Sequence, residues 1–273
     1  MTGEGWLVAL DIDGTVILED ETMGPGAPEA VARLTAEGHE VMLATGRSWS
    51  TVGQFLDALE ITPEFVVCSN GAVIMRRTDE GYVRWQVETF DASKVLTLLR
   101  GHLPDARYMV ELASGARLFT SDIGGWSLEG ATQVSFEELS AQPVSRVVVV
   151  SPDHDEDDFH RLVAEAGLNE VSYAVGWTAW LDIAPLGVDK GTALEYVRAE
   201  LDVPADRILV AGDGRNDVGM FSWALAGGGR AVAMGQAVDE VKAAAGEVTD
   251  AVEDGGLARA LSTIPAPAQG LSR

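Results

Sequence analysis

The feature that most constrains the fold is a repeated alternation between short apolar runs and helix-like stretches. In the first third of the chain, apolar runs at residues 6–10, 39–44 and 64–69 are separated by helix-like segments at 27–38 and 50–59. Strands that are apolar at nearly every position are typical of a parallel sheet with helices on both faces. This part of the chain therefore predicts an α/β fold with a Rossmann-like, doubly wound parallel sheet.

The same alternation returns late in the chain. Apolar runs and helix-like segments follow one another there at 189–201, 207–212, 217–225, 230–234, 237–246 and 255–261. We therefore expect residues 1–82 and 186–262 to form one α/β core. Residues 263–273 contain Pro, Ser and Gly, and we expect them to form a flexible tail.

The middle of the chain has a different pattern, with many strand-like segments and few helical ones. The strand-like segments read YVRWQVE, RYMVEL, ARLFT, RVVVV, VSYAV and WLDIA, and the helical ones ASKVLTLLRGHL and DEDDFHRLVAEAG. Such a mixture is typical of an antiparallel α+β domain. We expect residues 83–185 to form a domain of this kind, inserted into the core.

Polar clusters stand directly after four of the apolar runs of the core. They are Asp11 and Asp13, Thr45-Gly46-Arg47, Ser69-Asn70-Gly71, and the segment GDGRND at 212–217. The C-terminal ends of parallel strands lie along one edge of a sheet, where ligands bind. We therefore expect the four clusters to meet in one site.

That convergence would bring together the carboxylates of Asp11, Asp13, Asp213 and Asp217. Two like charges 4 Å apart repel by about 4 kcal/mol at an effective dielectric constant near 20. A cation would relieve this repulsion, and carboxylate oxygens are ligands that Mg²⁺ prefers. The alternative is that these are ordinary loop and cap aspartates. An EF-hand, a dinucleotide-binding glycine motif and an ATP-binding P-loop are all excluded by the spacing of the residues.

Composition narrows the choice of partners. Lys and Arg number 19 against 43 Asp and Glu, a formal net charge of −24, which disfavours nucleic acid and anionic membranes. No run approaches the roughly 20 apolar residues of a membrane span. Cys68 is the one cysteine, so an internal disulfide is excluded. With no signal peptide apparent, we expect a cytoplasmic protein, and its oligomeric state stays open.

Several motifs occur in an order that resembles the haloacid dehalogenase (HAD) superfamily of phosphohydrolases. These motifs are DIDGT at 11–15, ATGR at 44–47, GVDKGTAL at 187–194 and GDGRND at 212–217. SNGA at 69–72, AVAMG at 231–235 and AVEDGGLARAL at 251–261 resemble the Cof-type branch, whose inserted α+β domain is a cap. Gln236 departs from this pattern, in which Asn usually follows AMG.

The resemblance implies a magnesium-dependent phosphatase. In such an enzyme Asp11 is the nucleophile that forms an aspartyl-phosphate, and Asp13 is the general acid and base. Mg²⁺ is held by Asp11, the Asp13 backbone carbonyl and Asp213, with Asp217 in or beside its ligand shell. Lys190 supplies a positive charge to the phosphoryl group.

The resemblance also implies phosphate- and substrate-binding residues. Thr45 would hydrogen-bond a phosphoryl oxygen, and Gly14 and Gly46 would let backbone N–H groups face the phosphate. Asn216 would orient the phosphate or Lys190, and Asn70 would lie at the edge of the substrate. Arg47 either binds substrate or pairs with an acid, and the sequence does not decide between them.

The function that we expect is hydrolysis of small phosphorylated metabolites, with sugar phosphates as one substrate class. A phosphomutase of sugar phosphates, or a phosphate-ligand sensor with little turnover, are the alternatives. Tyr173, Trp177 and Trp180 could stack on a substrate, but packing inside the inserted domain is the preferred interpretation.

Overall fold

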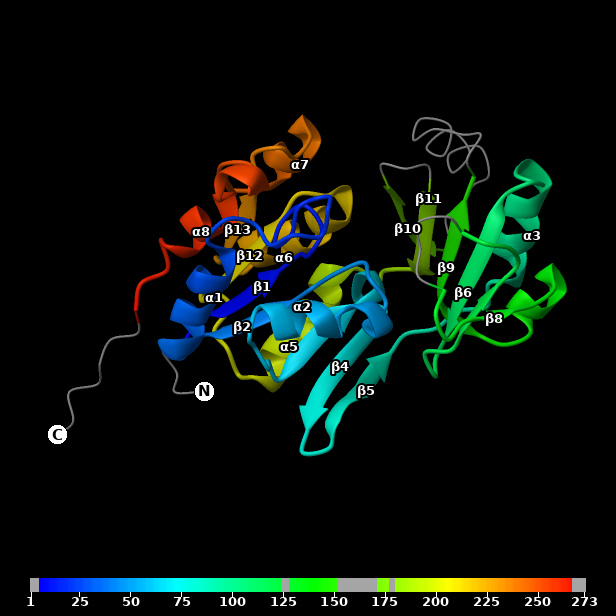
Figure 1. The fold of residues 1–273 in the computed structure, drawn as a ribbon, viewed down its shortest axis with the longest axis horizontal. Coiled ribbons are helices and arrows are strands. Elements are labelled where there is room, and N and C mark those ends of the chain that lie inside the picture. The colour runs from blue at the N-terminus through cyan, green and yellow to red at the C-terminus, as the bar shows by residue number, and fades with distance from the viewer. Residues whose placement is uncertain (1–4, 124–127, 152–170, 177–179, 267–273) are drawn as a thin grey trace. The chain divides into compact units, whose positions relative to one another are not determined.

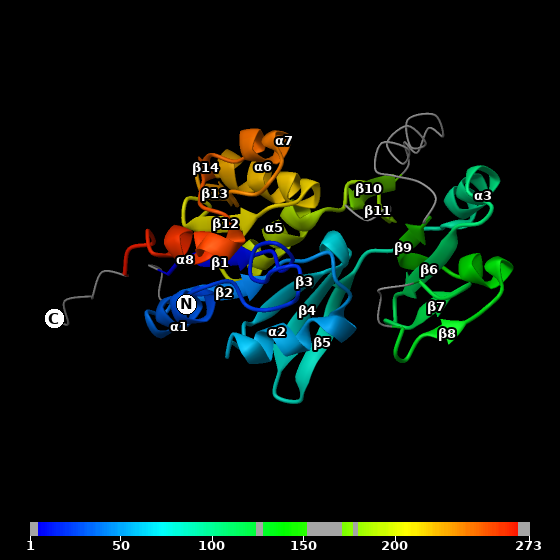
Figure 2. The ribbon, with the colours of Figure 1, turned by 45° about the horizontal axis from the view of Figure 1, so that its top comes forward.

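A computed structural model of the chain describes residues 5–123, 128–151, 171–176 and 180–266. The chain divides into two compact units, a core unit of Met1–Trp85 and Asp189–Arg273 and an inserted unit of Gln86–Val188 (Figures 1 and 2). The predicted domain boundaries at 82/83 and 185/186 stay predictions. The expected helix DEDDFHRLVAEAG, Trp177 and the tail from residue 267 lie outside the described residues.

A parallel sheet with the strand order β14-β13-β12-β1-β2 is the centre of the core unit. Its strands are β1 Leu7–Leu10, β2 Glu40–Leu43, β12 Ile208–Gly212, β13 Arg230–Ala233 and β14 Glu247–Val248. The predicted α/β fold with a parallel core is therefore confirmed. The chain adds β2 on one side of β1 and β12 to β14 on the other, so the winding reverses at β1. Ligand sites of such sheets lie at this reversal, beyond the C-terminal ends of the strands.

Helices cover both faces of this sheet (Figure 2). They are α1 Ala27–Ala36, α2 Gly53–Ala58, α5 Lys190–Glu200, α6 Val218–Ala226, α7 Asp239–Ala244 and α8 Gly256–Leu261. Leu7 and Ala9 of β1 belong to one buried cluster with side chains of α5 and α6. Val8 and Leu10 point to the opposite face and are also fully buried. This double burial explains why β1 is apolar at every position.

Strand β3, Phe65–Cys68, continues the sheet beside β2 through a parallel bridge between Ala44 and Val67. It also begins an antiparallel sheet with the order β3-β4-β5, in which β4 is Val73–Thr78 and β5 is Gly81–Val87. The sequence did not predict β4, because three apolar residues are followed there by the polar run Arg76–Thr78.

The inserted unit contains a sheet with the order β10-β11-β9-β6-β7-β8, antiparallel except between β7 and β8. Its strands are β6 Arg107–Leu112, β7 Arg117–Phe119, β8 Thr132–Gln133, β9 Val144–Val150, β10 Val171–Gly176 and β11 Trp180–Pro185. Helix α3, Ser93–His102, packs on one face through Val95, Leu96 and Leu99. The expected α+β character of this region is confirmed. Within the described residues, no helix combines the length and apolarity that a bilayer span requires, and cytoplasmic location stays a prediction.

Candidate active site

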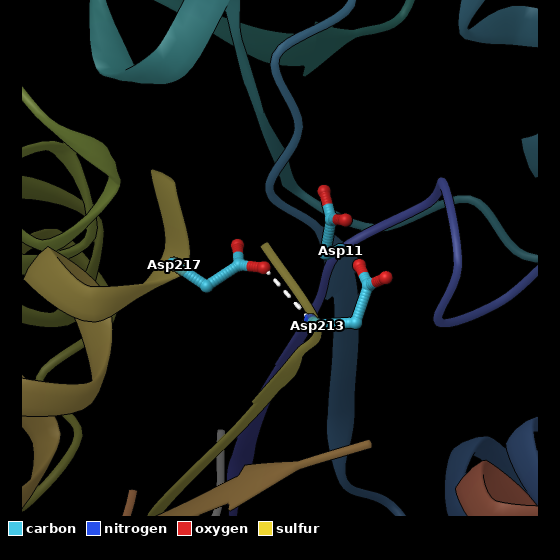
Figure 3. A group of neighbouring side chains, drawn as sticks. All are labelled: Asp11, Asp213 and Asp217. Carbon is cyan, nitrogen blue, oxygen red and sulfur yellow. Dashed lines mark hydrogen bonds between the residues drawn. The ribbon is translucent and has the colours of Figure 1, made fainter. Parts of the chain in front are cut away.

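Three aspartates that are distant in sequence lie together beyond the ends of β1 and β12 (Figure 3). Asp11 follows β1, Asp213 follows β12, and Asp217 ends the 3₁₀ turn Arg215–Asp217. One carboxylate oxygen from each lies within 4.8 Å of those of the other two. The side chains are buried, with exposed fractions of 4% for Asp11, 8% for Asp213 and 0% for Asp217. The structure thus brings together three of the four predicted carboxylates.

Lys190 places its ammonium group between two of these carboxylates. Its Nζ lies 2.6 Å from Asp11 Oδ1 and 2.6 Å from Asp217 Oδ1, and the residue is fully buried. Lys190 begins α5 because Asp189 caps this helix, accepting a hydrogen bond of 2.8 Å from the backbone N–H of Thr192. The helix start therefore fixes where the lysine side chain enters the site.

Asp217 holds the loop that carries Asp213. Its Oδ2 accepts hydrogen bonds of 2.9 Å from the backbone N–H groups of Asp213 and Gly214, and its Oδ1 accepts one from Lys190. The dashed line in Figure 3 marks the first of these bonds. Because both oxygens already have protein donors, Asp217 has less capacity for a cation than Asp11 or Asp213. Its main role is to hold the Asp213–Gly214 backbone and the Lys190 side chain in position.

The electrostatics of the cluster leave negative charge in excess. Burial raises the pKa of Asp11 well above its usual value, and Asp217, Asp13 and Asp213 raise it further, although Lys190 lowers it. Burial and the charge of Asp217 raise the pKa of Asp213 to about 7. Burial alone would lower the pKa of Lys190, but Asp11 and Asp217 together raise it. The site therefore favours a positive charge.

This donor set fits a divalent cation. When all three carboxylates are ionised, they leave two negative charges beyond the one ammonium group, which is the charge that a divalent cation neutralises. Hard carboxylate oxygens suit Mg²⁺. The Asp13 side chain lies outside the group of three and faces Arg47 instead, so the part of Asp13 in metal binding, through its backbone carbonyl, stays a prediction.

Gly14 is required by the close packing of the Asp213 carboxylate. Its φ is +71°, in the left-handed region, and a Cβ at this position would overlap the carboxylate of Asp213. The Gly14 N–H donates a hydrogen bond of 3.0 Å to the carbonyl of Ile17. The structure therefore gives this glycine a role in seating Asp213, and its contact with phosphate stays a prediction.

Four predicted phosphate- and substrate-binding residues also lie together. The Asn70 N–H donates to the Thr45 carbonyl at 3.1 Å, and the Asn216 amide donates to Asn70 Oδ1 at 2.9 Å. A Cβ on Gly46 would lie 3.1 Å from Asn70 Oδ1. Thr45 is fully buried, and its Oγ1 accepts a hydrogen bond of 3.1 Å from the Arg47 N–H. Asn216 stands next to Asp217 in sequence, so this polar group adjoins the carboxylates.

Arg47 pairs with acids in this structure. Its guanidinium forms two parallel hydrogen bonds to Asp13, of 2.6 and 2.9 Å, and contacts Glu21 at 2.8 Å. The guanidinium also lies 4.7 Å from the centre of the Phe55 ring. Sequence reasoning missed Glu21, which has no motif around it. Phosphate binding by Arg47 stays a prediction, because the structure shows it holding Asp13.

A family model described as haloacid dehalogenase-like hydrolase matches residues 8–261. The chain belongs to this family. The predicted resemblance to the HAD superfamily and its Cof-type branch is thus confirmed.

Individual HAD relatives match along nearly their whole length. The 5-amino-6-(5-phospho-D-ribitylamino)uracil phosphatase YitU of Bacillus subtilis (strain 168) is 25% identical over 269 residues, covering 96% of this chain and 98% of that protein. A solved haloacid dehalogenase-like hydrolase from B. subtilis has a TM-score of 0.78 and 22% identity, covering 95% of this chain and 99% of that one. The HAD subclass IIB sugar phosphatase BT4131 has a TM-score of 0.76 and 19% identity, with coverages of 94% and 98%.

Proposed function

We propose that this HAD hydrolase is a Mg²⁺-dependent phosphatase that cleaves phosphate monoesters of small metabolites through an aspartyl-phosphate on Asp11. The observation that carries the proposal is the buried group of Asp11, Asp213, Asp217 and Lys190, in which three acids share one ammonium group. An uncompensated group of this kind is costly in a folded protein. A cation-dependent reaction at Asp11 would explain why the protein contains such a group.

Asp11 is the proposed nucleophile, and it follows the buried strand β1. Lys190 binds Asp11 Oδ1 at 2.6 Å, which orients the carboxylate and lowers its proton affinity. Mg²⁺ held by Asp11, Asp213 and the Asp13 carbonyl would neutralise the charge that otherwise keeps a phosphate dianion away from Asp11. Asp213 and Asp217 contribute by keeping this donor set in place.

Asp13 is the proposed general acid and base. Its side chain is 57% exposed and pairs with Arg47, so it reaches solvent and an entering substrate. It would protonate the leaving alkoxide and then take a proton from the water that hydrolyses the aspartyl-phosphate. Thr45 has a hydroxyl hydrogen to donate to a phosphoryl oxygen, since its oxygen already accepts from Arg47.

Sugar or polyol phosphates are the proposed substrate class. Support comes from the names of two similar proteins, a phosphatase of a phosphoribitylamino compound and a sugar phosphatase. Both names describe a phosphate ester on a polyhydroxylated carbon chain. Substrate choice within the class would depend on the inserted unit.

Release of p-nitrophenol from p-nitrophenyl phosphate tests the reaction. We expect turnover with Mg²⁺, none after chelation with EDTA, and a loss of at least about 1,000-fold in kcat for Asp11→Asn, because the nucleophile is removed. Asp57→Asn, at an exposed position of α2, is the matched control and should keep wild-type activity. Activity that survives in Asp11→Asn would contradict the proposal. Accumulation of an isomer of a sugar phosphate in place of inorganic phosphate would favour the phosphomutase alternative, and no turnover would favour the sensor.

A further inference from the structure

Gln236 lies beside the cluster of Asp11, Asp213 and Asp217, although the sequence did not predict it there. It follows β13, in the loop that leads to α7, and is half-buried. The sequence marks it only as a departure from the Asn that is usual at this point of the family pattern. The structure shows that its side chain contacts three separate loops.

The Gln236 amide forms hydrogen bonds at both of its ends. Its Nε2 donates to the Gly14 carbonyl at 2.6 Å and to Asp213 Oδ2 at 3.3 Å. Its Oε1 accepts from the Val252 N–H at 3.0 Å. A backbone N–H can only donate, and a carbonyl and an ionised carboxylate can only accept, so these partners allow one orientation of the amide.

The backbone around Gln236 is held equally firmly. The Met234 N–H donates to the Gly212 carbonyl at 2.9 Å, which ties the loop to the end of β12. The Gly235 N–H donates to the Asp250 carbonyl at 2.9 Å, and a Cβ on Gly235 would lie 2.6 Å from the Ala251 nitrogen. The backbone hydrogen bonds of Met234 and Gly235 therefore fix the position from which the Gln236 side chain extends.

Gly14 and Asp213, which both accept hydrogen bonds from Gln236 Nε2, lie against each other. The space beside the Gly14 Cα is filled by the Asp213 carboxylate. The side chain of an Asp at the start of a loop can rotate about its χ angles, and ordering it costs conformational entropy. The Gln236 amide restricts that rotation by engaging one carboxylate oxygen of Asp213 and the carbonyl that lies against it.

We propose that Gln236 is a positioning residue of the cation site, which orients Asp213 and the Gly14 loop before the cation binds. The proposal depends on the proposed function, since it assigns Asp213 to the cation. Residues that orient metal ligands by hydrogen bonds commonly change metal affinity by about 10- to 100-fold when they are replaced. An effect of that size is expected here.

The experiment measures Mn²⁺ binding to the full-length protein without substrate, by isothermal titration calorimetry and by the electron paramagnetic resonance signal of free Mn²⁺. Gln236→Leu has a similar size but lacks both hydrogen-bonding ends, and we expect its Kd for Mn²⁺ to rise about 10-fold or more. Gln236→Asn keeps a shorter amide and should bind between the two. Gln54→Leu is the control, because Gln54 is exposed on α2 and makes one backbone contact to Thr51; its Kd should stay within about two-fold of wild type.

Kinetics separate positioning from a general structural role. For Gln236→Leu, the Mg²⁺ concentration for half-maximal activity should rise by the same factor as the Kd, while the KM for p-nitrophenyl phosphate at saturating Mg²⁺ stays unchanged. A Kd within two-fold of wild type, or a loss explained by an unfolded fraction in circular dichroism, overturns the proposal. If the wild type hydrolyses the ester with Mg²⁺ and Gln236→Leu binds Mn²⁺ normally, only this inference fails. If the wild type binds no Mn²⁺, the metal part of the proposed function fails with it.

Discussion

Two regions of the molecule bury charged side chains, and they do so in opposite ways. In the core unit, Asp11, Asp213 and Asp217 lie together with one lysine, which contacts Asp11 and Asp217, so acids outnumber bases. In the inserted unit, two arginines and two acids lie across one sheet, namely Arg117 on β7, Glu111 on β6, Arg146 on β9 and Asp182 on β11. Their exposed fractions are 7%, 1%, 2% and 3%.

In the inserted unit, the pairing of residues between neighbouring strands places these acids and bases next to each other. Glu111 stands directly opposite Arg117 on one side and Arg146 on the other, and residues opposite each other share a face of the sheet. Arg146 Nε binds Asp182 Oδ1 at 2.7 Å. We call these four residues the charged row. Two positive and two negative groups alternate along it, so the formal charges of the row sum to zero.

The comparison shows that burial of charge alone does not mark an active site. The charged row lies within strands, where the backbone hydrogen bonds belong to the sheet. The carboxylate group lies beyond strand ends, where loop N–H groups and a helix start add donors. The two regions differ in charge balance: the cluster with more acids than bases is the one that fits a cation.

The largest expected effect comes from breaking the balance of the charged row. Arg146→Met removes the guanidinium that Asp182 binds, and removal of one partner of a buried pair costs about 3–5 kcal/mol. Arg146→Met with Asp182→Leu should recover much of this loss, because the buried charges that remain, Glu111 and Arg117, are then one acid opposite one base. Differential scanning calorimetry of the full chain measures both.

Arg100→Met is the control for that experiment. Arg100 pairs with Glu137 in the same unit, but its side chain is 50% exposed, so its loss should cost less than about 1 kcal/mol. A double variant no more stable than Arg146→Met alone would show that packing, and not charge, decides the stability of the charged row.

A smaller effect on stability is expected when Mg²⁺ binds to the core unit. Mg²⁺ at about 100 times its Kd should stabilise the wild type by about 2.7 kcal/mol, since it binds only the folded protein. Asp213→Asn removes one ligand and should lose most of this gain. In Arg146→Met the core unit is unchanged. Mg²⁺ should therefore raise the free energy of unfolding of the core unit as much in this variant as in the wild type. Equal stabilisation of wild type and Asp213→Asn would place the cation elsewhere.

Sequence reasoning found the acids of the core because each stands after an apolar strand. Asp11 and Asp213 could be predicted because ligand sites lie beyond the C-terminal ends of parallel strands. The roles of Lys190 and Thr45 came from the family resemblance. The contacts of Glu21 and Gln236 could not be foreseen, because they depend on loop conformations that no periodicity encodes. Gln236 and Gly14 are 222 residues apart.

The charged row escaped prediction for a related reason. Charged residues in antiparallel strands ordinarily face water, so Glu111 and Arg146 carry no sign of burial in the sequence. Only the register, which places Glu111 opposite Arg146, shows that they compensate each other. Registers between strands that are distant in sequence depend on the whole sheet, and local patterns do not determine them.

The smallest expected effect, taken per pH unit, is a pH dependence of stability that belongs to the cluster of Asp11, Asp213 and Asp217. The pKa of Asp213 is raised to about 7, chiefly by burial and by the charge of Asp217, whereas an unfolded Asp titrates near 3.9. Between roughly pH 4 and pH 7 the folded protein therefore binds more protons than the unfolded chain. Without cation, its stability should fall as the pH rises through this window, by up to about 1.4 kcal/mol per pH unit for one group.

Urea unfolding in EDTA at several pH values measures this slope. Asp213→Asn cannot take up the proton, so its stability should fall less steeply over the same window. With Mg²⁺ the wild-type slope should flatten, because the cation binds the ionised carboxylates and competes with protons. Identical slopes for the two proteins in EDTA would mean that Asp213 is ionised without a cation, and the contrast between an unbalanced and a balanced region would then lose its energetic basis.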